Sequence, residues 1–422
     1  MEKFISVLGF FLMIGICWFW STDRKKIDWK LVLNGTLLQL AFAFIFLKTT
    51  WGQSAFHFVD SFVNNLLAQS RAGAVFLFSS VLGDPEKAAE IFGEGNGFFF
   101  AFQALPLIIF VSALTAILYN LHVMQLVVNA MAFLMRKVMR ISGAEAVAAA
   151  GNVFVGMTEA PLMVRPYLSK MTLSEMNCLI VGGFATIAGS VLGSYVIMLS
   201  SYIDGVAAHF VAASVMSAPA AIVFAKIMVP ETGTPETMKH RKIATDDSQE
   251  NVLDACGRGC SEGLKLALNV AGMLIGFLSL VAMCHWLWNA AAGACGVEWL
   301  TLQKVISWIC SPFAFLLGIP FQDILPCAEL IGEKTFMNEF VAYSHFAQML
   351  NGPLAECSER TRVIISYALC GFANIGSIGI VLGGIGSLVP EQRKNISRLA
   401  LKALVAGTFA SFSTAIIAGL LY

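Results

Sequence analysis

Long apolar runs separated by short polar stretches dominate the chain, and this pattern predicts a helical membrane protein. A helix needs about 20 residues to cross the ~30 Å hydrocarbon core of a bilayer. Eight runs approach that length and predict transmembrane helices, at residues 4–20, 31–47, 98–120, 176–200, 206–228, 264–290, 361–389 and 396–421. Residues 52–70 mix large apolar and polar side chains, so they predict an interfacial helix instead.

Basic clusters in the short loops predict how the chain is oriented. Short loops rich in lysine and arginine stay on the cytoplasmic side of a membrane. Residues 23–26, 136–140 and 393–402 carry such clusters, which places both termini outside. Residues 230–262 are the one extended hydrophilic stretch and predict a cytoplasmic connector.

Two stretches interrupt the apolar pattern in the same way. Residues 151–162 and 338–343 place Glu159 and Glu339 in apolar surroundings, and each is followed by an apolar segment broken at 185–190 or 372–377. Irregular backbone at membrane depth persists only where it is buried in protein or lines a wet cavity. We therefore expect two re-entrant helical hairpins, each followed by a broken helix, in an inverted structural repeat. Paired interruptions of this kind are typical of the binding site of a secondary transporter.

The repeat divides an all-α polytopic chain into four parts. Residues 1–140 and 231–304 predict a scaffold, made of the first three spans with interfacial helices and of the connector with a long span. Residues 141–230 and 305–422 each predict a hairpin, a broken helix and a following span.

Composition excludes several other classes of protein. The chain is 57% hydrophobic and 13% charged, whereas a soluble domain is about 25% charged. A net charge of zero gives no basic field for nucleic acid. The sequence contains no metal-ligand spacing, nucleophile elbow or phosphate loop, which predicts neither an enzyme nor a bound cofactor.

The two glutamates are the first candidates for a binding site, because a carboxylate at membrane depth is costly unless it has a function. Two alternatives stay open on the residues alone. The pair could act as acid and base, as in glycoside hydrolysis. Either glutamate could instead cap a helix or pair with Arg165.

Other polar residues near the interruptions are open to two interpretations. Asn152 and Thr186, with the backbone carbonyls of Val155 and Ile187, could ligate a sodium ion at a broken helix. They could equally make interhelical hydrogen bonds. Asn374 and Ser377 lie three residues apart, on one helical face, and are harder to explain by packing.

Small residues after the second interruption predict close helix packing. We expect this role for three glycines, Gly383, Gly384 and Gly386.

Several motifs resemble those of the concentrative nucleoside transporter family. The matching stretches are 156–162 (GMTEAPL), 332–334 (GEK), 338–343 (NEFVAY), 358–360 (SER) and 367–374 (YALCGFAN), and the span order is similar along the whole chain. The resemblance implies a homotrimer in a bacterial inner membrane, with a scaffold domain and a moving transport domain. It also implies ion-coupled import of nucleosides by alternating access.

The resemblance assigns site residues by position. The nucleobase would contact Gly156, Met157, Thr158, Glu159, Val191 and Phe372, and the ribose would contact Glu339, Asn374 and Ser377. Sodium would be held by Asn152, Val155, Thr186 and Ile187. Pyrimidine-accepting relatives often have glutamine where this chain has Met157, which predicts a preference for purine nucleosides. Sodium is the expected coupling ion; proton coupling, a pseudouridine substrate, a channel and an enzyme acting on nucleosides remain alternatives.

Overall fold

The computed structural model describes residues 1–93, 97, 99–238, 251–297 and 299–422, and it contains no β-strand among them. The first part of the chain is built from six helices, which are α1 (Glu2–Phe19), α2 (Trp29–Lys48), α3 (Thr50–Gly83), α4 (Pro85–Phe92), α5 (Phe100–Asn120) and α6 (Val123–Met139). Short 3-10 helices connect the longer elements, at η1 (Arg24–Lys26), η2 (Arg165–Lys170), η3 (Glu236–Met238), η4 (Phe321–Asp323) and η5 (Pro390–Gln392).

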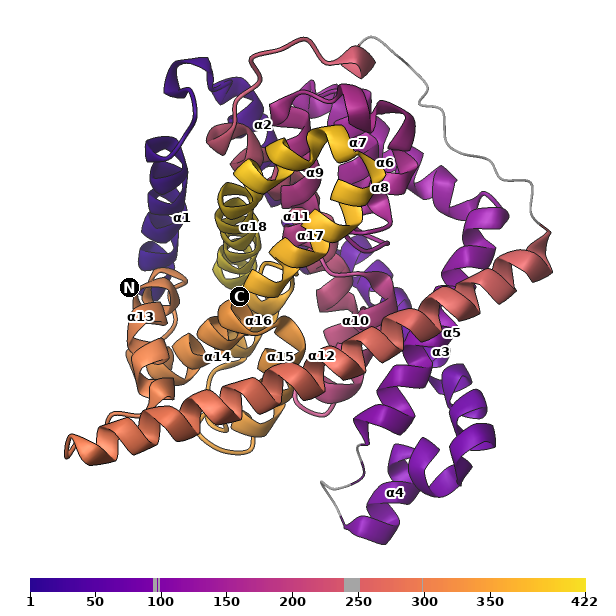
Figure 1. The fold of residues 1–422 in the computed structure, drawn as a ribbon, viewed down its shortest axis with the longest axis vertical. Helices are drawn as coiled ribbons and strands as arrows, with labels where there is room; N and C mark the ends of the chain where they lie inside the picture. The colour runs from indigo at the N-terminus through magenta and orange to yellow at the C-terminus, as the bar shows by residue number, and fades with distance from the viewer. Residues whose placement is uncertain (94–96, 98, 239–250, 298) are drawn as a thin grey trace.

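The same order of two short helical arms, a broken helix and a long helix occurs twice along the chain. The first set is α7 (Gly143–Gly151), α8 (Ala160–Met163), α9 (Leu173–Ala185), α10 (Gly189–Leu199) and α11 (Val206–Met228). The second set is α14 (Ile324–Phe336), α15 (Glu339–Met349), α16 (Glu359–Leu369), α17 (Ile375–Leu388) and α18 (Arg393–Leu421). Between them lie α12 (Val252–Ala294) and α13 (Leu302–Leu316). Figure 1 places α7 and α8 toward the top of the molecule and α14 and α15 toward the bottom.

Two segments in the first part of the chain differ from the prediction. The helix expected at 52–70 continues as α3 to Gly83, with one non-helical residue, Ser79, at a φ of 69°. Residues 85–92, for which the sequence analysis predicted no helix, form α4. The Asp84 side chain accepts a hydrogen bond from the backbone of Glu86, and Pro85 occupies the first turn, so the local sequence starts a helix there.

Eight helices of the described chain are long and apolar enough to cross a membrane. This number equals the predicted number of spans, although one predicted span is replaced by another helix. The stretch Thr50–Phe92 belongs to this set. The predicted span at 361–389 does not, because α16 is short and polar, and only Ile375–Leu388 is apolar. The chain is thus a multi-pass membrane protein whose second broken helix is apolar in only one half.

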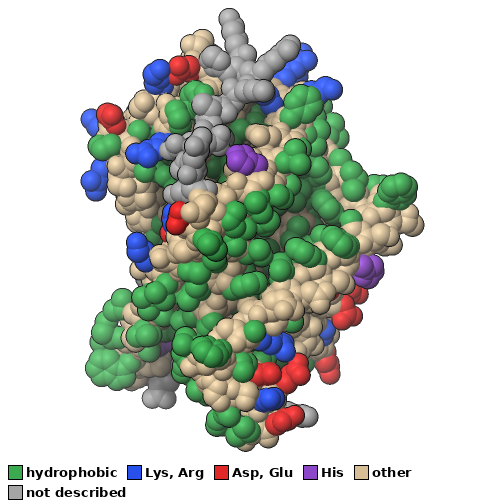
Figure 2. Space-filling view, turned by 90° about the vertical axis from the view of Figure 1, so that its right-hand side faces the viewer, with side chains coloured by type: hydrophobic (Ala, Val, Ile, Leu, Met, Phe, Trp, Pro, Cys, Tyr) green, Lys and Arg blue, Asp and Glu red, His purple; other side chains and the backbone are tan. Residues whose placement is uncertain are grey.

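The helices fall into an interior and a peripheral group. The apolar windows of α9–α10 and α11 are each 89% buried, whereas those of α1 and α12 are 22% and 6% buried. Figure 2 shows hydrophobic side chains across the middle of one face, with charged side chains gathered mainly toward its ends. A continuous exposed apolar surface of this kind is compatible with a lipid environment rather than with water.

A buried ionic cluster joins the first hairpin to two interior helices. Lys226 on α11 forms an ion pair with Glu145 on α7, and the side chains of these two residues are 8% and 1% exposed. The Lys226 ammonium also donates to Ser174 Oγ on α9 at 3.0 Å and lies 3.2 Å from a carboxylate oxygen of Glu231. Glu145 also closes a capping box with Ser142 at the start of α7. The cluster therefore fixes where the first hairpin begins.

Replacing Lys226 by Met should leave the Glu145 carboxylate buried without its cation. We expect a loss of about 3–5 kcal/mol in the free energy of unfolding, measured by thermal unfolding in detergent, because an uncompensated buried charge is costly. The double variant Lys226→Met/Glu145→Gln should recover most of this loss, since glutamine still completes the capping box.

The exposed pair of Lys170 and Glu236 provides the matched control, with side chains that are 65% and 41% exposed. Lys170→Met should change stability by about 1 kcal/mol or less. A loss in Lys226→Met no larger than this would contradict the structural role of the cluster.

Candidate functional site

The two broken helices meet at their interruptions. The Phe372 N–H, in the break between α16 and α17, donates to the Thr186 carbonyl, in the break between α9 and α10, at 3.2 Å. The Gly189 N–H donates to the Phe154 carbonyl at the tip of the first hairpin at 3.0 Å. Backbone groups that helices leave unpaired are thus satisfied between segments that are distant in sequence. The interruption at 185–190 is bonded to both the other broken helix and the hairpin.

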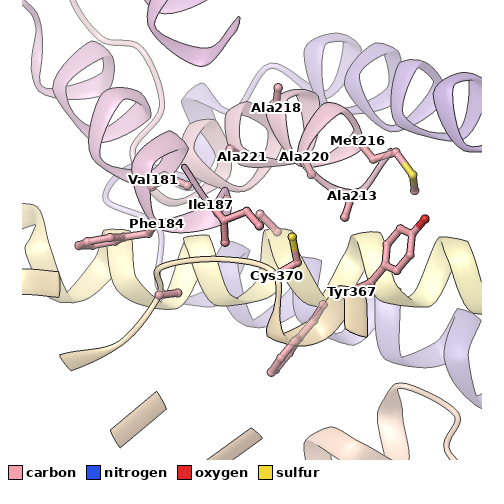
Figure 3. Close-up of a cluster of buried hydrophobic side chains, with 14 of the residues drawn as sticks. Val181, Phe184, Ile187, Ala213, Met216, Ala218, Ala220, Ala221, Tyr367 and Cys370 are labelled. Carbon is pink, nitrogen blue, oxygen red and sulfur yellow. The ribbon is translucent and has the colours of Figure 1, made fainter. Parts of the chain in front are cut away.

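Glycine makes this close approach possible. A Cβ on Gly371 would lie 2.6 Å from Ser411 Oγ and 2.9 Å from the Phe184 carbonyl, and one on Gly407 would lie 2.6 Å from Phe184 Cβ. Figure 3 shows Phe184 and Cys370 in the buried cluster beside the small side chains of α11. Small residues let helix backbones approach closely, and here they permit the crossing of the two breaks.

The second hairpin and the second broken helix bring three predicted residues together. Asn338 caps α15 by accepting from the Val341 N–H at 2.9 Å, and Asn374 caps α17 by accepting from the Ser377 N–H at 2.8 Å. Glu339 is the first residue of α15, and its carboxylate accepts from Asn374 Nδ2 at 3.1 Å. Ser377 Oγ also donates to Asn374 Oδ1 at 3.0 Å. The N-terminal ends of two helices therefore surround one buried carboxylate, which their dipoles favour.

Tyr195 on α10 belongs to the same cluster and was missed from the sequence. Its hydroxyl donates to the other Glu339 carboxylate oxygen at 3.1 Å, and its ring centroid lies 4.8 Å from that of Phe340 and 4.6 Å from that of Tyr343. A tyrosine inside an apolar helix must find a partner for its hydroxyl, which is the one signal the sequence offered. The signal did not identify the partner.

Asn152, at the end of α7, and Thr186, at the end of α9, both lie beside Gly182. A Cβ on Gly182 would be 2.9 Å from Asn152 Nδ2, and Thr186 Oγ1 donates to the Gly182 carbonyl at 2.9 Å. The Asn152 side chain is buried, and neither its oxygen nor its nitrogen has a hydrogen-bond partner in the described part of the chain. The alternative of a simple interhelical hydrogen bond therefore does not describe Asn152. A buried, unpartnered amide oxygen is available to a cation.

The tip of the first hairpin lies between α9, α17 and the break. A Cβ on Gly183 would be 2.5 Å from Met157 Cβ, and one on Gly156 would be 3.3 Å from Ala188 Cβ. The Thr158 methyl group lies 3.4 Å from the position of a Cβ on Gly384. Val155, Ile187 and Val191 are all buried near this region of the chain.

No bond joins Glu159 to Glu339 in the described part of the chain. The Glu159 side chain is exposed. No hydrogen bond or ion pair joins Glu159 to Glu339 or to Arg165 among the described residues. The acid and base pair considered from the sequence has no geometric support here.

The prediction that Gly383 packs closely is wrong. A Cβ on Gly383 would meet nothing within 4 Å, and those on Gly384 and Gly386 would make ordinary contacts at 3.4 and 3.5 Å. Gly371 and Gly407 at the crossing are packed more tightly than these three glycines.

Replacing Gly371 by Ala tests the crossing of the two breaks. The added methyl group would overlap the Phe184 carbonyl and Ser411 Oγ, so we expect a loss of about 1–3 kcal/mol in thermal unfolding. Gly379→Ala is the matched control, because a Cβ there would meet nothing within 4 Å and alanine is the better helix former by about 1 kcal/mol. Equal effects of the two substitutions would contradict the tight crossing.

Comparison with known proteins places this geometry in a family. The chain matches three protein-family models. They are described as "Na+ dependent nucleoside transporter C-terminus" over residues 209–419, "Na+ dependent nucleoside transporter N-terminus" over residues 8–81 and "Nucleoside recognition" over residues 101–202.

Relatives and solved structures agree with these matches. An uncharacterized transporter of Haemophilus influenzae is 40% identical over 100% of this chain and 98% of its own length. Sodium/nucleoside cotransporter 1 of Rattus norvegicus is 37% identical over 100% of this chain, which spans 64% of that protein. The structure of CNTnw in an inward-facing substrate-bound state matches with a TM-score of 0.91 at 39% identity, over 100% of this chain and 98% of that one. These relatives are transporters rather than enzymes, and the chain belongs to the concentrative nucleoside transporter family.

Proposed function

We propose that this protein is a sodium-coupled symporter that imports nucleosides, with a preference for purine nucleosides, by alternating access. The observation that carries the proposal is the buried cluster of Glu339, Asn374, Ser377 and Tyr195, formed where the second hairpin meets both broken helices. Such a cluster combines a charge with hydrogen-bonding groups in an apolar environment, which is typical of a substrate site at membrane depth.

Glu339 is suited to bind the ribose. An ionised carboxylate has about four acceptor positions, and two interactions, with Tyr195 and Asn374, are present. The remaining positions can accept two ribose hydroxyl protons. Asn374 and Ser377 supply further polar atoms beside them. A nucleoside that lacked these hydroxyls would leave buried acceptors unpaired, which favours the complete ribose.

The sodium ion is assigned to Asn152 and Thr186, with the carbonyls of Val155 and Ile187. Sodium binds oxygen ligands at broken helices, and the unpartnered Asn152 amide oxygen is such a ligand. The Thr186 hydroxyl donates its proton to Gly182, so its lone pairs remain available. This chemistry favours sodium over a proton, because neither Asn152 nor Thr186 titrates.

Thr186 connects the ion site to the substrate site. Its hydroxyl bonds to the Gly182 carbonyl, and Gly182 also lies beside Asn152. Its own carbonyl accepts a hydrogen bond from the N–H of Phe372, a residue that we assign to nucleobase binding. Binding of sodium at Thr186 therefore orders the backbone that positions Phe372. A ligand that stabilises the arrangement needed by a second ligand increases its affinity, and the effect is reciprocal.

The nucleobase is assigned to Gly156, Met157, Thr158 and Val191 with Phe372 and Glu159. Met157 packs against Gly183 and offers a polarizable apolar surface to a purine ring. Glu159 is exposed in this structure, so its contact with the base would need a change at the hairpin tip.

We infer the domain organisation and the oligomeric state from membership of the family. We assign residues 1–140 and 231–304 mainly to a scaffold, and the two repeats, 141–230 and 305–422, to a moving transport domain with re-entrant hairpins. The weakly buried apolar helices α1 and α12 are compatible with an outer position in a homotrimer of a bacterial inner membrane, with both termini outside.

Uptake by the purified protein in proteoliposomes tests the function. Labelled inosine should accumulate above its external concentration when a sodium gradient is imposed and should fail to do so under a pH gradient alone. Glu339→Gln should reduce uptake at least 100-fold, about 3 kcal/mol, because a charged hydrogen-bond partner is lost. Chromatography of the internal label should recover unchanged inosine.

Other outcomes separate the alternatives. Equilibration without accumulation would indicate a channel, accumulation under a pH gradient alone would indicate proton coupling, and a modified label would indicate an enzyme. Ser387→Ala is a control, since Ser387 is exposed and its hydroxyl bonds only within α17.

Met157→Gln tests the purine preference. Glutamine offers the paired hydrogen bonds of an amide, so uridine should compete for inosine uptake about tenfold better in the variant than in the original protein. Competition curves with uridine, cytidine and guanosine measure the change. An unchanged order of competitors would refute the assignment of Met157 to the nucleobase.

A further inference from the structure

A second cluster of charged side chains lies between the two arms of the second hairpin. It consists of Glu329 and Glu333 on α14 and His345 on α15. One ligand atom from each of the three residues lies within 4.8 Å of the other two. None of these residues takes part in the nucleoside or sodium sites proposed above.

The local sequence explains the arrangement. Glu329 and Glu333 are four residues apart, so both project from one face of α14. The antiparallel arm α15 packs against α14 and brings His345 Nδ1 to 2.8 Å from Glu333 Oε1. Two carboxylates and an imidazole therefore converge across a hairpin rather than along a single helix.

The cluster is not satisfied by its internal bonds. Glu333 Oε2 is buried and has no hydrogen-bond partner, and Glu329 makes no hydrogen bond among the residues that the structure describes. Two carboxylates one helical turn apart repel each other unless a cation lies between them. A single bond from His345 to Glu333 leaves most of the acceptor positions of the two carboxylates unused.

We propose that Glu329, Glu333 and His345 form a binding site for a divalent transition metal ion, with Zn²⁺ as the probe that defines it. Imidazole and carboxylate groups are the ligands of many zinc sites with three protein ligands and one open position. Ligands at about 2.1 Å from a tetrahedral ion lie about 3.4 Å from one another. The ligand atoms here are up to 4.8 Å apart, and rotation of these partly buried side chains can bring them to the shorter spacing.

Metal binding replaces a proton in this site. The neutral His345 ring would coordinate through Nδ1, and the proton it shares with Glu333 would leave to solvent. The bound ion would link α14 to α15, the helix that begins at Glu339, and would tie the two arms together. Mg²⁺ prefers six oxygen ligands and keeps much of its water, so it is a poor competitor.

Zinc titration of the purified full chain, without a histidine tag, tests the proposal. Exposed or half-buried thiols also bind zinc, so Cys256, Cys260, Cys284 and Cys295 are first replaced by serine. Competition with a chromophoric chelator should then show one zinc ion per chain. The melting temperature should rise on saturation, because the ion binds the folded state.

Three substitutions identify the ligands. Glu329→Gln, Glu333→Gln and His345→Asn should each weaken zinc binding by about tenfold or more. Glu329→Gln is the sharpest of these, because it removes no hydrogen bond and should leave the fold intact. His285→Asn is the matched control, since His285 is half-buried and bonds to Gln303 at 3.1 Å on other helices.

The expected result is loss of binding in the three variants and full binding in the control, with millimolar Mg²⁺ without effect. Zinc affinity unchanged by Glu329→Gln and His345→Asn, or equally reduced by His285→Asn, would overturn the proposal. Absence of stoichiometric binding in the cysteine-replaced protein would overturn it as well.

Discussion

The structure depends on the crossing of two helix interruptions. A break in a buried helix exposes backbone groups whose burial without partners would cost free energy. Here the Phe372 N–H bonds to the Thr186 carbonyl, so each break supplies part of what the other lacks. The crossing requires glycine at 371, where a side chain would overlap the neighbouring backbone. The need to satisfy irregular backbone thus fixes the relative position of the two repeats, and the proposed binding sites follow from it.

The interior helices carry small side chains, which lets them pack closely around the crossing. Ala213, Ala220 and Ala221 on α11 lie in the buried cluster around the breaks (Figure 3). Gly407 on α18 lets that helix approach Phe184. In a bilayer no hydrophobic effect draws helices together, so close van der Waals packing of small residues has to do so. The peripheral helices carry large exposed apolar residues instead, which suits contact with lipid.

Some of the fold and of the site could be predicted from the sequence because the signals are local. Glycine, proline and polar residues at 151–162 and 372–377 mark the interruptions, and Glu339, Asn374 and Ser377 do meet in one cluster. Residues whose role depends on a distant partner gave no such signal. Tyr195 reads as an ordinary aromatic residue in an apolar run, yet it bonds to Glu339. The direction of Glu159 was also beyond prediction, because residues in turns have no helical phase that fixes where a side chain points.

Two buried polar side chains, Lys226 and Asn152, differ in how completely they are hydrogen-bonded, and the difference fits different roles. Lys226 has carboxylate and hydroxyl partners for its ammonium group and needs nothing further, so it holds the first hairpin in place. Asn152 is equally buried, but neither atom of its amide is bonded. Leaving such a group unpaired costs about 1–3 kcal/mol, which natural sequences tolerate where a ligand supplies the missing partner. An incomplete set of hydrogen bonds is therefore stronger support for an ion site at Asn152 than polarity alone. The same reasoning leaves Glu339, with two of its acceptor positions occupied, suited to a ligand that brings donors of its own.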